Sequence, residues 1–121
     1  RRIVGGLLGH WGVWTHTAVR LQGELACAAA SPTLEAAWLA TAAEVTDMNA
    51  ALFDAAHAFH GCIPGILEVL RRQGLVETNL CLNPDEVLSP GQAEELTRVT
   101  HAYPHLIDDD FVAEHRDEWL A

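Results

Sequence analysis

The chain has 121 residues, half of them apolar, and a formal net charge of −10 at pH 7. This composition argues against disorder of the whole chain and allows one compact core. The negative charge argues against nucleic acid and anionic membranes as partners, because both are bound by basic surfaces.

The first predicted element is a short buried strand within residues 3–14. This stretch is apolar, and its early glycines make a long helix improbable and favour a glycine-rich turn. The Ala-rich stretch 15–30 is then predicted to be helical, although Gly23 weakens it.

The strongest predicted helix follows Ser31-Pro32, a pair typical of a helix start. Apolar and small residues recur at helical spacing from Leu34 to Leu52, without any interrupting proline or glycine. We therefore expect this helix to be the most buried one in the protein. We also expect its apolar face to be wider than the shorter helices after it can cover, so that it offers a surface for association.

Local signals also fix the ends of a shorter helix that follows. Pro64 suits the first turn of a helix, and Gly74 suits a left-handed residue just beyond its last turn. Leu75 can then fold back on Leu70, which is the usual hydrophobic contact at such a helix end.

Two further helices are predicted after an extended connector over residues 79–87. Ser89-Pro90-Gly91-Gln92 has the pattern of a capping box, with Ser89 as N-cap and Gln92 reaching back. That helix should continue to about Ala102, where Tyr103-Pro104 stops it. Three acids at residues 108–110 then favour the start of a last helix, which has an apolar stripe.

The segment R-R-Q-G-L, a proline-containing link and the helix L-S-P-G-Q-A-E-E-L resemble the C-terminal end of the dihydrodipicolinate synthase / N-acetylneuraminate lyase family. The glycine-bearing stretch 5–14 is similar to the eighth strand of that family's (β/α)₈ barrel. The resemblance implies a mostly α chain with one short N-terminal strand, equivalent to the last strand and C-terminal helices of a TIM barrel.

We expect residues 1–121 to form a single unit. Within it we expect a glycine-rich strand and turn (1–17), core helices (18–76), and a connector with C-terminal helices (77–121). The chain starts at Arg1, and its one methionine is Met48, so we expect it to be part of a longer or processed protein.

The family resemblance implies a lyase or aldolase that acts on 2-oxo acids through a lysine Schiff base. This chain contains no lysine, and its one tyrosine, Tyr103, falls outside the barrel strands, so no catalytic residue can be assigned. We expect the isolated chain to be inactive and to associate with the remainder of its barrel or with itself. The alternative is a non-catalytic helical interaction or oligomerisation module.

His10, Trp11 and Thr15 are the candidate substrate-binding residues, because loops after barrel strands face the active site. The alternative for the tryptophans is that they fill the interface between the strand and the helices. The residues leave open the substrate, the reaction direction and the oligomeric state.

No metal site and no cofactor are assigned. His57, His60 and Cys62 are spaced closely enough for zinc, but no second ligand motif accompanies them, so we expect helix-end histidines. Cys27, Cys62 and Cys81 are odd in number and irregularly spaced, which argues against a disulfide framework and favours the cytoplasm.

Overall fold

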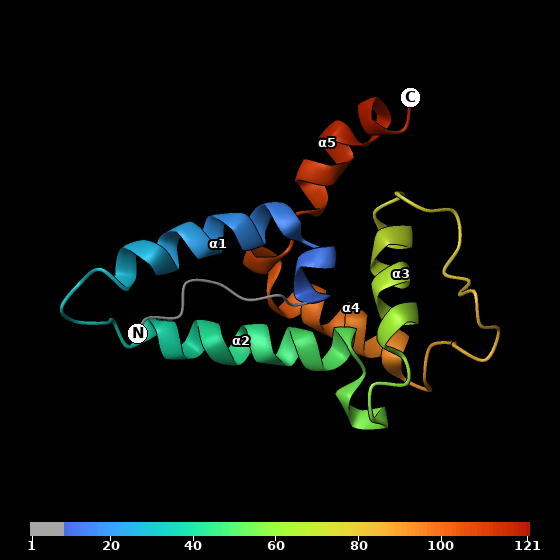
Figure 1. Ribbon diagram of the computed structural model, residues 1–121, viewed down its shortest axis with the longest axis horizontal. Coiled ribbons are helices and arrows are strands. Elements are labelled where there is room, and N and C mark those ends of the chain that lie inside the picture. Colours follow the sequence, from blue (N-terminus) through green and yellow to red (C-terminus); the bar gives the residue numbers. More distant parts are fainter. Residues whose placement is uncertain (1–8) are drawn as a thin grey trace.

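The computed structural model describes residues 9–121 and shows only helices and connecting segments in that range (Figure 1). The α-helices are α1 (Thr15–Ala28), α2 (Ala37–Leu52), α3 (Cys62–Arg72), α4 (Gln92–Ala102) and α5 (Asp109–Trp119). Short 3₁₀ helices occur at Gly9–Gly12 (η1), Ala55–His57 (η2) and Pro104–Leu106 (η3).

The expected strand is wrong, and with it the expected fragment of a (β/α)₈ barrel. Residues 9–121 contain no strand, and the described part of the expected strand begins with the 3₁₀ helix η1. Residues 3–8 of that expectation lie outside the described residues. Val13 and Trp14 are buried as expected, but they pack among helices, and Trp14 turns the chain with a left-handed φ of 52°. A short apolar run does not by itself distinguish a strand from a helical segment.

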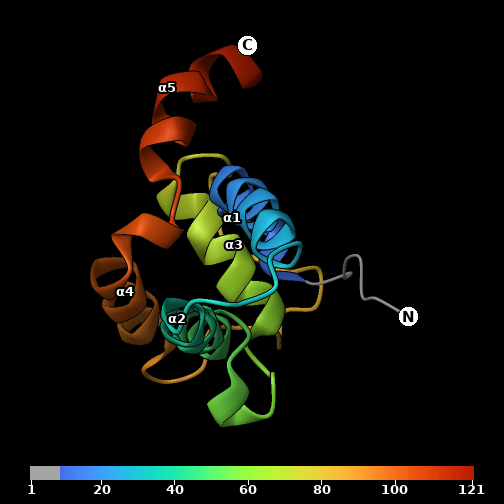
Figure 2. The same ribbon diagram turned by 90° about the vertical axis from the view of Figure 1, so that its left-hand side faces the viewer.

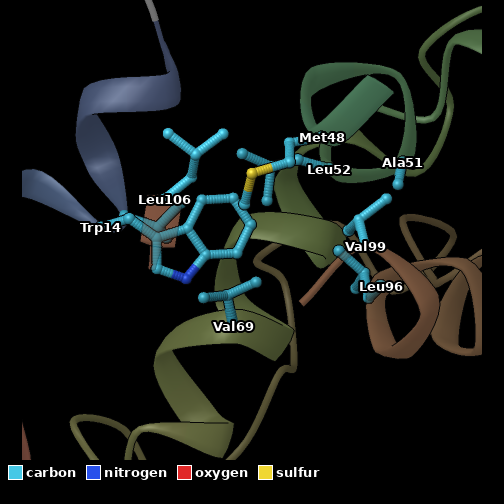
Figure 3. Close-up of a cluster of buried hydrophobic side chains, with 9 residues drawn as sticks. Trp14, Met48, Ala51, Leu52, Val69, Leu96, Val99 and Leu106 are labelled. Atoms are coloured by element: carbon cyan, nitrogen blue, oxygen red, sulfur yellow. The ribbon is translucent and has the colours of Figure 1, made fainter. Parts of the chain in front are cut away.

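The core lies where the end of α2 meets α3, α4 and η3. Figure 3 shows the Trp14 ring lying among side chains of several of these elements, with Val69 and Leu106 close to it. The buried cluster consists of Val13, Trp14, Met48, Ala51, Leu52, Val69, Leu96, Val99 and Leu106.

Helix α2 is not the most buried helix along its whole length. Only Met48, Ala51 and Leu52, all in its last turns, are buried. Its first half is exposed, with Leu39 at 76% exposure. The helix begins at Ala37, so Ser31-Pro32 lies in the loop before it and does not open it.

The end of α3 follows its local signals. Gly74 is left-handed with φ 75°, and the Leu75 N–H donates to the Leu70 carbonyl at 2.9 Å. This bond is the long hydrogen bond of a glycine-terminated helix end, and the left-handed conformation of Gly74 is as predicted.

The start of α4 follows its signals only in part. The Gln92 side chain accepts a hydrogen bond from the Ser89 N–H at 3.1 Å, which is half of the predicted capping box. The N-cap, however, is Gly91 with φ 83°, because the Ser89 hydroxyl donates to Asp54 instead. The predicted end of α4 at Ala102 is confirmed.

Helix α5 stands away from the other helices in both views (Figures 1 and 2). Val112 is the one residue of α5 that is buried. The packed end of the molecule therefore leaves α5 and the far halves of α1 and α2 largely uncovered.

Candidate interaction surfaces

A closed polar cluster joins α2, α3 and α4. Asp54 follows α2 in a left-handed conformation (φ 58°), and its side chain turns inward, leaving the residue 3% exposed. Its carboxylate accepts hydrogen bonds from the Ser89 hydroxyl at 2.6 Å and the Gly61 N–H at 2.9 Å, and it bonds His57 Nδ1 at 2.6 Å. One side chain thus fixes three segments of the chain.

Gln92 completes this cluster from α4. Its amide nitrogen donates to the Gly61 carbonyl at 2.9 Å, while its amide oxygen accepts the Ser89 N–H. A Cβ at Gly61 would collide with Gln92 and Asp54, and one at Gly65 would collide with the Leu52 carbonyl. Both glycines are therefore required for the close approach of α3 to its neighbours.

The cluster holds an aspartate, a histidine and a serine, but it does not have the geometry of a nucleophilic triad. In such a triad the histidine lies between serine and aspartate and takes the serine proton. Here the buried Ser89 hydroxyl donates directly to Asp54. Burial opposes ionisation of Asp54, but hydrogen bonds from Ser89, His57 and Gly61 outweigh it and lower the pKa of the carboxyl. The cluster therefore acts as a structural joint.

Glu68 organises a second polar cluster, which connects α3 to the connector and, through Arg72, to α4. Its buried carboxylate binds Arg71 and Arg72 at 2.8–2.9 Å and accepts a hydrogen bond from Asn79 at 3.0 Å. Hydrogen bonding from Arg71, followed by that from Arg72, lowers the pKa of Glu68 to about 2 despite burial. Arg72 also donates to the Ala93 carbonyl at 2.9 Å, which ties α3 to α4.

The three candidate substrate-binding residues lie around the start of α1. The Thr15 hydroxyl donates to the Trp11 carbonyl at 2.8 Å, so Thr15 braces the turn between η1 and α1. Trp11 is half-buried and Thr15 is exposed, while the His10 side chain lies outside the described residues. Their role in substrate binding stays a prediction, although the barrel on which it rested is wrong.

A cavity of about 300 Å³ lies beside them, between the start of α1 and the link from η3 to α5. Several of its polar groups are already hydrogen-bonded within the fold. Asp108 accepts hydrogen bonds from the His16 N–H at 2.9 Å and from Gln73 at 3.0 Å. The Thr17 hydroxyl donates to the Ile107 carbonyl at 2.9 Å. The residues around the cavity therefore connect the start of α1 to the segment that precedes α5.

The side chains of His57, His60 and Cys62 do not converge on one metal-binding position. His57 bonds Asp54, His60 is exposed, and burial raises the pKa of the half-buried Cys62 thiol. Within residues 9–121, no three or more His, Cys, Asp or Glu side chains are placed to hold one metal ion.

The first large exposed surface is the helical arm, residues 19–43, which contains the far half of α1, the loop, and the first half of α2. No residue of the arm is buried. Leu34 and Leu39 are 68% and 76% exposed, and Val19 and Leu25 are also exposed. Between residues 25 and 43 the one charged residue is Glu35. Figure 1 shows both helices of the arm extending to the left of the packed end.

The second exposed surface is the aromatic stripe of α5. Phe111, His115 and Trp119 lie one turn apart, with ring centroids 4.4 Å and 5.6 Å from each neighbour to the next. His16 of α1 stacks on Phe111 at 3.9 Å and anchors the inner end. Trp119 at the outer end is 49% exposed.

Comparison with known proteins gives no match to a protein-family model, a curated protein or a solved structure. In the part of the chain that the structure describes, every helix is too short or too polar to cross a membrane.

Sequence reasoning missed Asp54, Glu68 and Asp108 as organising residues. Asp54 and Asp108 bond groups that are distant in the chain, and the burial of Glu68 depends on the elements that pack around α3. It expected the helix at 34–52 to be the most buried one and to offer an uncovered part of its face for association, but it did not say which part. The scarcity of charge between residues 25 and 43, where Glu35 is the one charged residue, is the signal that marks the arm in a chain with net charge −10.

Proposed function

We propose that this chain is a non-catalytic helical interaction module that self-associates through the helical arm. The observation that carries the proposal is the exposure of the arm: four large apolar side chains lie on a segment in which no residue is buried. Full burial of one such side chain is worth about 1.5–3 kcal/mol. A partner that covers the arm therefore gains substantial free energy.

Charge favours a second copy of the chain as that partner. A net charge of −10 makes two copies repel one another over most surfaces, and repulsion is smallest where charges are few. The arm has one charged residue between positions 25 and 43. Two arms packed side by side would form a four-helix arrangement with two-fold symmetry. The many alanines of the arm allow helices to approach closely.

The lyase function is not proposed for this chain. It requires a Schiff-base lysine, and the sequence contains none. The buried carboxylates instead connect helices and connecting segments of the fold.

The test is the mass of the chain in solution, measured by light scattering on a sizing column. Wild-type protein should run as a dimer or larger assembly, and a Leu34→Glu/Leu39→Glu variant should run as the 13.2 kDa monomer. Both leucines are exposed, so helix content by circular dichroism should not change. A Leu80→Glu/Leu82→Glu variant is the control, because these exposed leucines lie in the connector. A monomeric wild type, or equal dissociation of the control, would contradict the proposal.

A further inference from the structure

Helix α5 carries an acidic ridge beside its aromatic stripe. Asp110, Glu114 and Glu118 each precede a member of the stripe by one residue. Because a helix turns about 100° per residue, the three acids lie one above another along the flank of the aromatic side chains. All three are exposed. The surface is thus half aromatic and half anionic over three helical turns.

Within residues 9–121, no arginine side chain forms an ion pair with the acids of this ridge. The chain contains no lysine, and the five arginines within residues 9–121 all form ion pairs elsewhere or with a direct neighbour. These pairs are Arg20–Glu24, Arg71–Glu68, Arg72–Glu68, Arg98–Asp47 and Arg116–Asp117. Neutralisation of the ridge therefore requires positive charge from outside the described residues.

We propose that α5 docks a basic amphipathic helix of a partner protein. Apolar side chains of the partner would lie on the aromatic stripe, with Trp119 as the exposed anchor, and its Lys or Arg side chains would face the acidic ridge. Exposed tryptophan is a frequent energetic centre of interfaces, and complementary charge sets orientation and speeds association. Helix against helix is a common mode of peptide recognition.

Other occupants fit α5 less well. A second copy would bring the same acids against one another, and an anionic membrane or nucleic acid would be repelled by the ridge. The surface is also separate from the arm, because α5 projects from the opposite end of α1 (Figure 1). Docking at α5 and self-association through the arm are thus independent.

The probe is a fluorescein-labelled synthetic helix of leucines and lysines in amphipathic order, and its binding is followed by fluorescence anisotropy. A Glu114→Lys/Glu118→Lys variant should weaken binding about tenfold or more, since it reverses two charges of the ridge. The matched control is Glu77→Lys/Asp85→Lys, which changes net charge equally but lies in the exposed connector. The control should change the dissociation constant less than about threefold, through net charge alone.

A Trp119→Ala variant tests the apolar half of the site. The residue is at the exposed end of α5, so folding should be retained and peptide binding should fall about tenfold. The same peptide with glutamates in place of lysines should not bind. Equal losses of peptide affinity in the ridge and connector variants would mean that net charge alone explains the effect, and this would overturn the proposal. Unchanged peptide binding by Trp119→Ala would also overturn it.

Two further measurements exclude the other occupants. Vesicles with anionic lipid should not bind the chain. The ridge variant should keep the oligomeric state of the wild type. Binding of the chain to the vesicles, or dissociation of the assembly by the ridge variant, would overturn the proposal. The Leu34→Glu/Leu39→Glu variant should bind the peptide with a dissociation constant within about threefold of wild type. Failure of docking at α5 can thus be told apart from failure of self-association.

Discussion

The two ends of α2 differ more than any other pair of regions in the molecule. Leu52 in its last turn is 0% exposed and packs in the core, whereas Leu39 in its first turn is 76% exposed. The same residue type on one continuous helix thus belongs to the packed end in one case and to the helical arm in the other. Stability and interaction capacity can therefore be changed separately by substitution at the two ends.

The polar contacts show the same division. At the packed end, the buried carboxylate of Asp54 accepts a hydrogen bond from Ser89, 35 residues further on, and that of Glu68 connects α3 to the following connector through Asn79. In the arm, Arg20 and Glu24 form an exposed pair four residues apart. Exposed pairs of this kind contribute little to stability, whereas removal of one partner from a buried network costs several-fold more.

The largest expected effect comes from leucine truncation at the two ends of α2. Leu52→Ala should lower the free energy of unfolding by about 2–5 kcal/mol, because it leaves a cavity in the core. Leu39→Ala should change it by less than about 0.5 kcal/mol. Denaturant unfolding at a concentration where the assembly is fully dissociated measures both. Equal losses would mean that the arm belongs to the cooperative core.

Acid should weaken the packed end through Glu68. Its pKa in the folded chain is about 2, below the ordinary value of 4.5, so its contribution is fully present above the ordinary value and is lost as pH falls toward 2. We expect this loss to be about 2–3 kcal/mol, reduced by the solvent exposure of Arg71.

The measurement is unfolding in denaturant from pH 6 to pH 2 for wild type and Glu68→Gln. The variant should be less stable at pH 6 and should lose less stability on acidification. Asp47 and Asp54 also have lowered pKa values, but they affect both proteins, so the difference reports Glu68. Glu35→Gln, in the arm, is the control and should follow wild type; parallel curves for Glu68→Gln would contradict the assignment.

Glycine substitutions should have opposite signs in the two regions. Gly65→Ala should lower stability by about 1–3 kcal/mol, because its Cβ would collide with the Leu52 carbonyl. Gly23→Ala should raise stability by about 0.5–1 kcal/mol, because nothing lies near its Cβ and alanine favours a helix. Thermal melts decide the signs, and a stabilised Gly65→Ala would contradict the packing described for α3.

Features determined by neighbouring residues could be predicted from the sequence. Gly74 and Leu75 end α3 as expected, Gln92 reaches back to Ser89, and α4 stops at Ala102. Each of these depends on the conformations and hydrogen bonds of a few consecutive residues. Such rules apply whichever fold surrounds them.

Features determined by distant residues could not be predicted. The strand expected within residues 3–14 required a neighbouring strand, and in the described residues Val13 and Trp14 pack among helices instead. The face from Leu34 to Leu52 has the period of a buried helix, but periodicity does not say whether another element covers it. For the same reason the sequence did not show which half of that helix is exposed, and the exposure of α5 was missed.

Asp108 has a consequence for the order in which the protein is made. Its carboxylate accepts the His16 N–H in the first turn of α1, from 92 residues further along the chain. A ribosome adds about 5–20 residues per second, so His16 is synthesised roughly 5–18 s before Asp108. During that interval the first turn of α1 lacks its acceptor. The hydrogen bonding of α1 is therefore completed only after Asp108 has been synthesised.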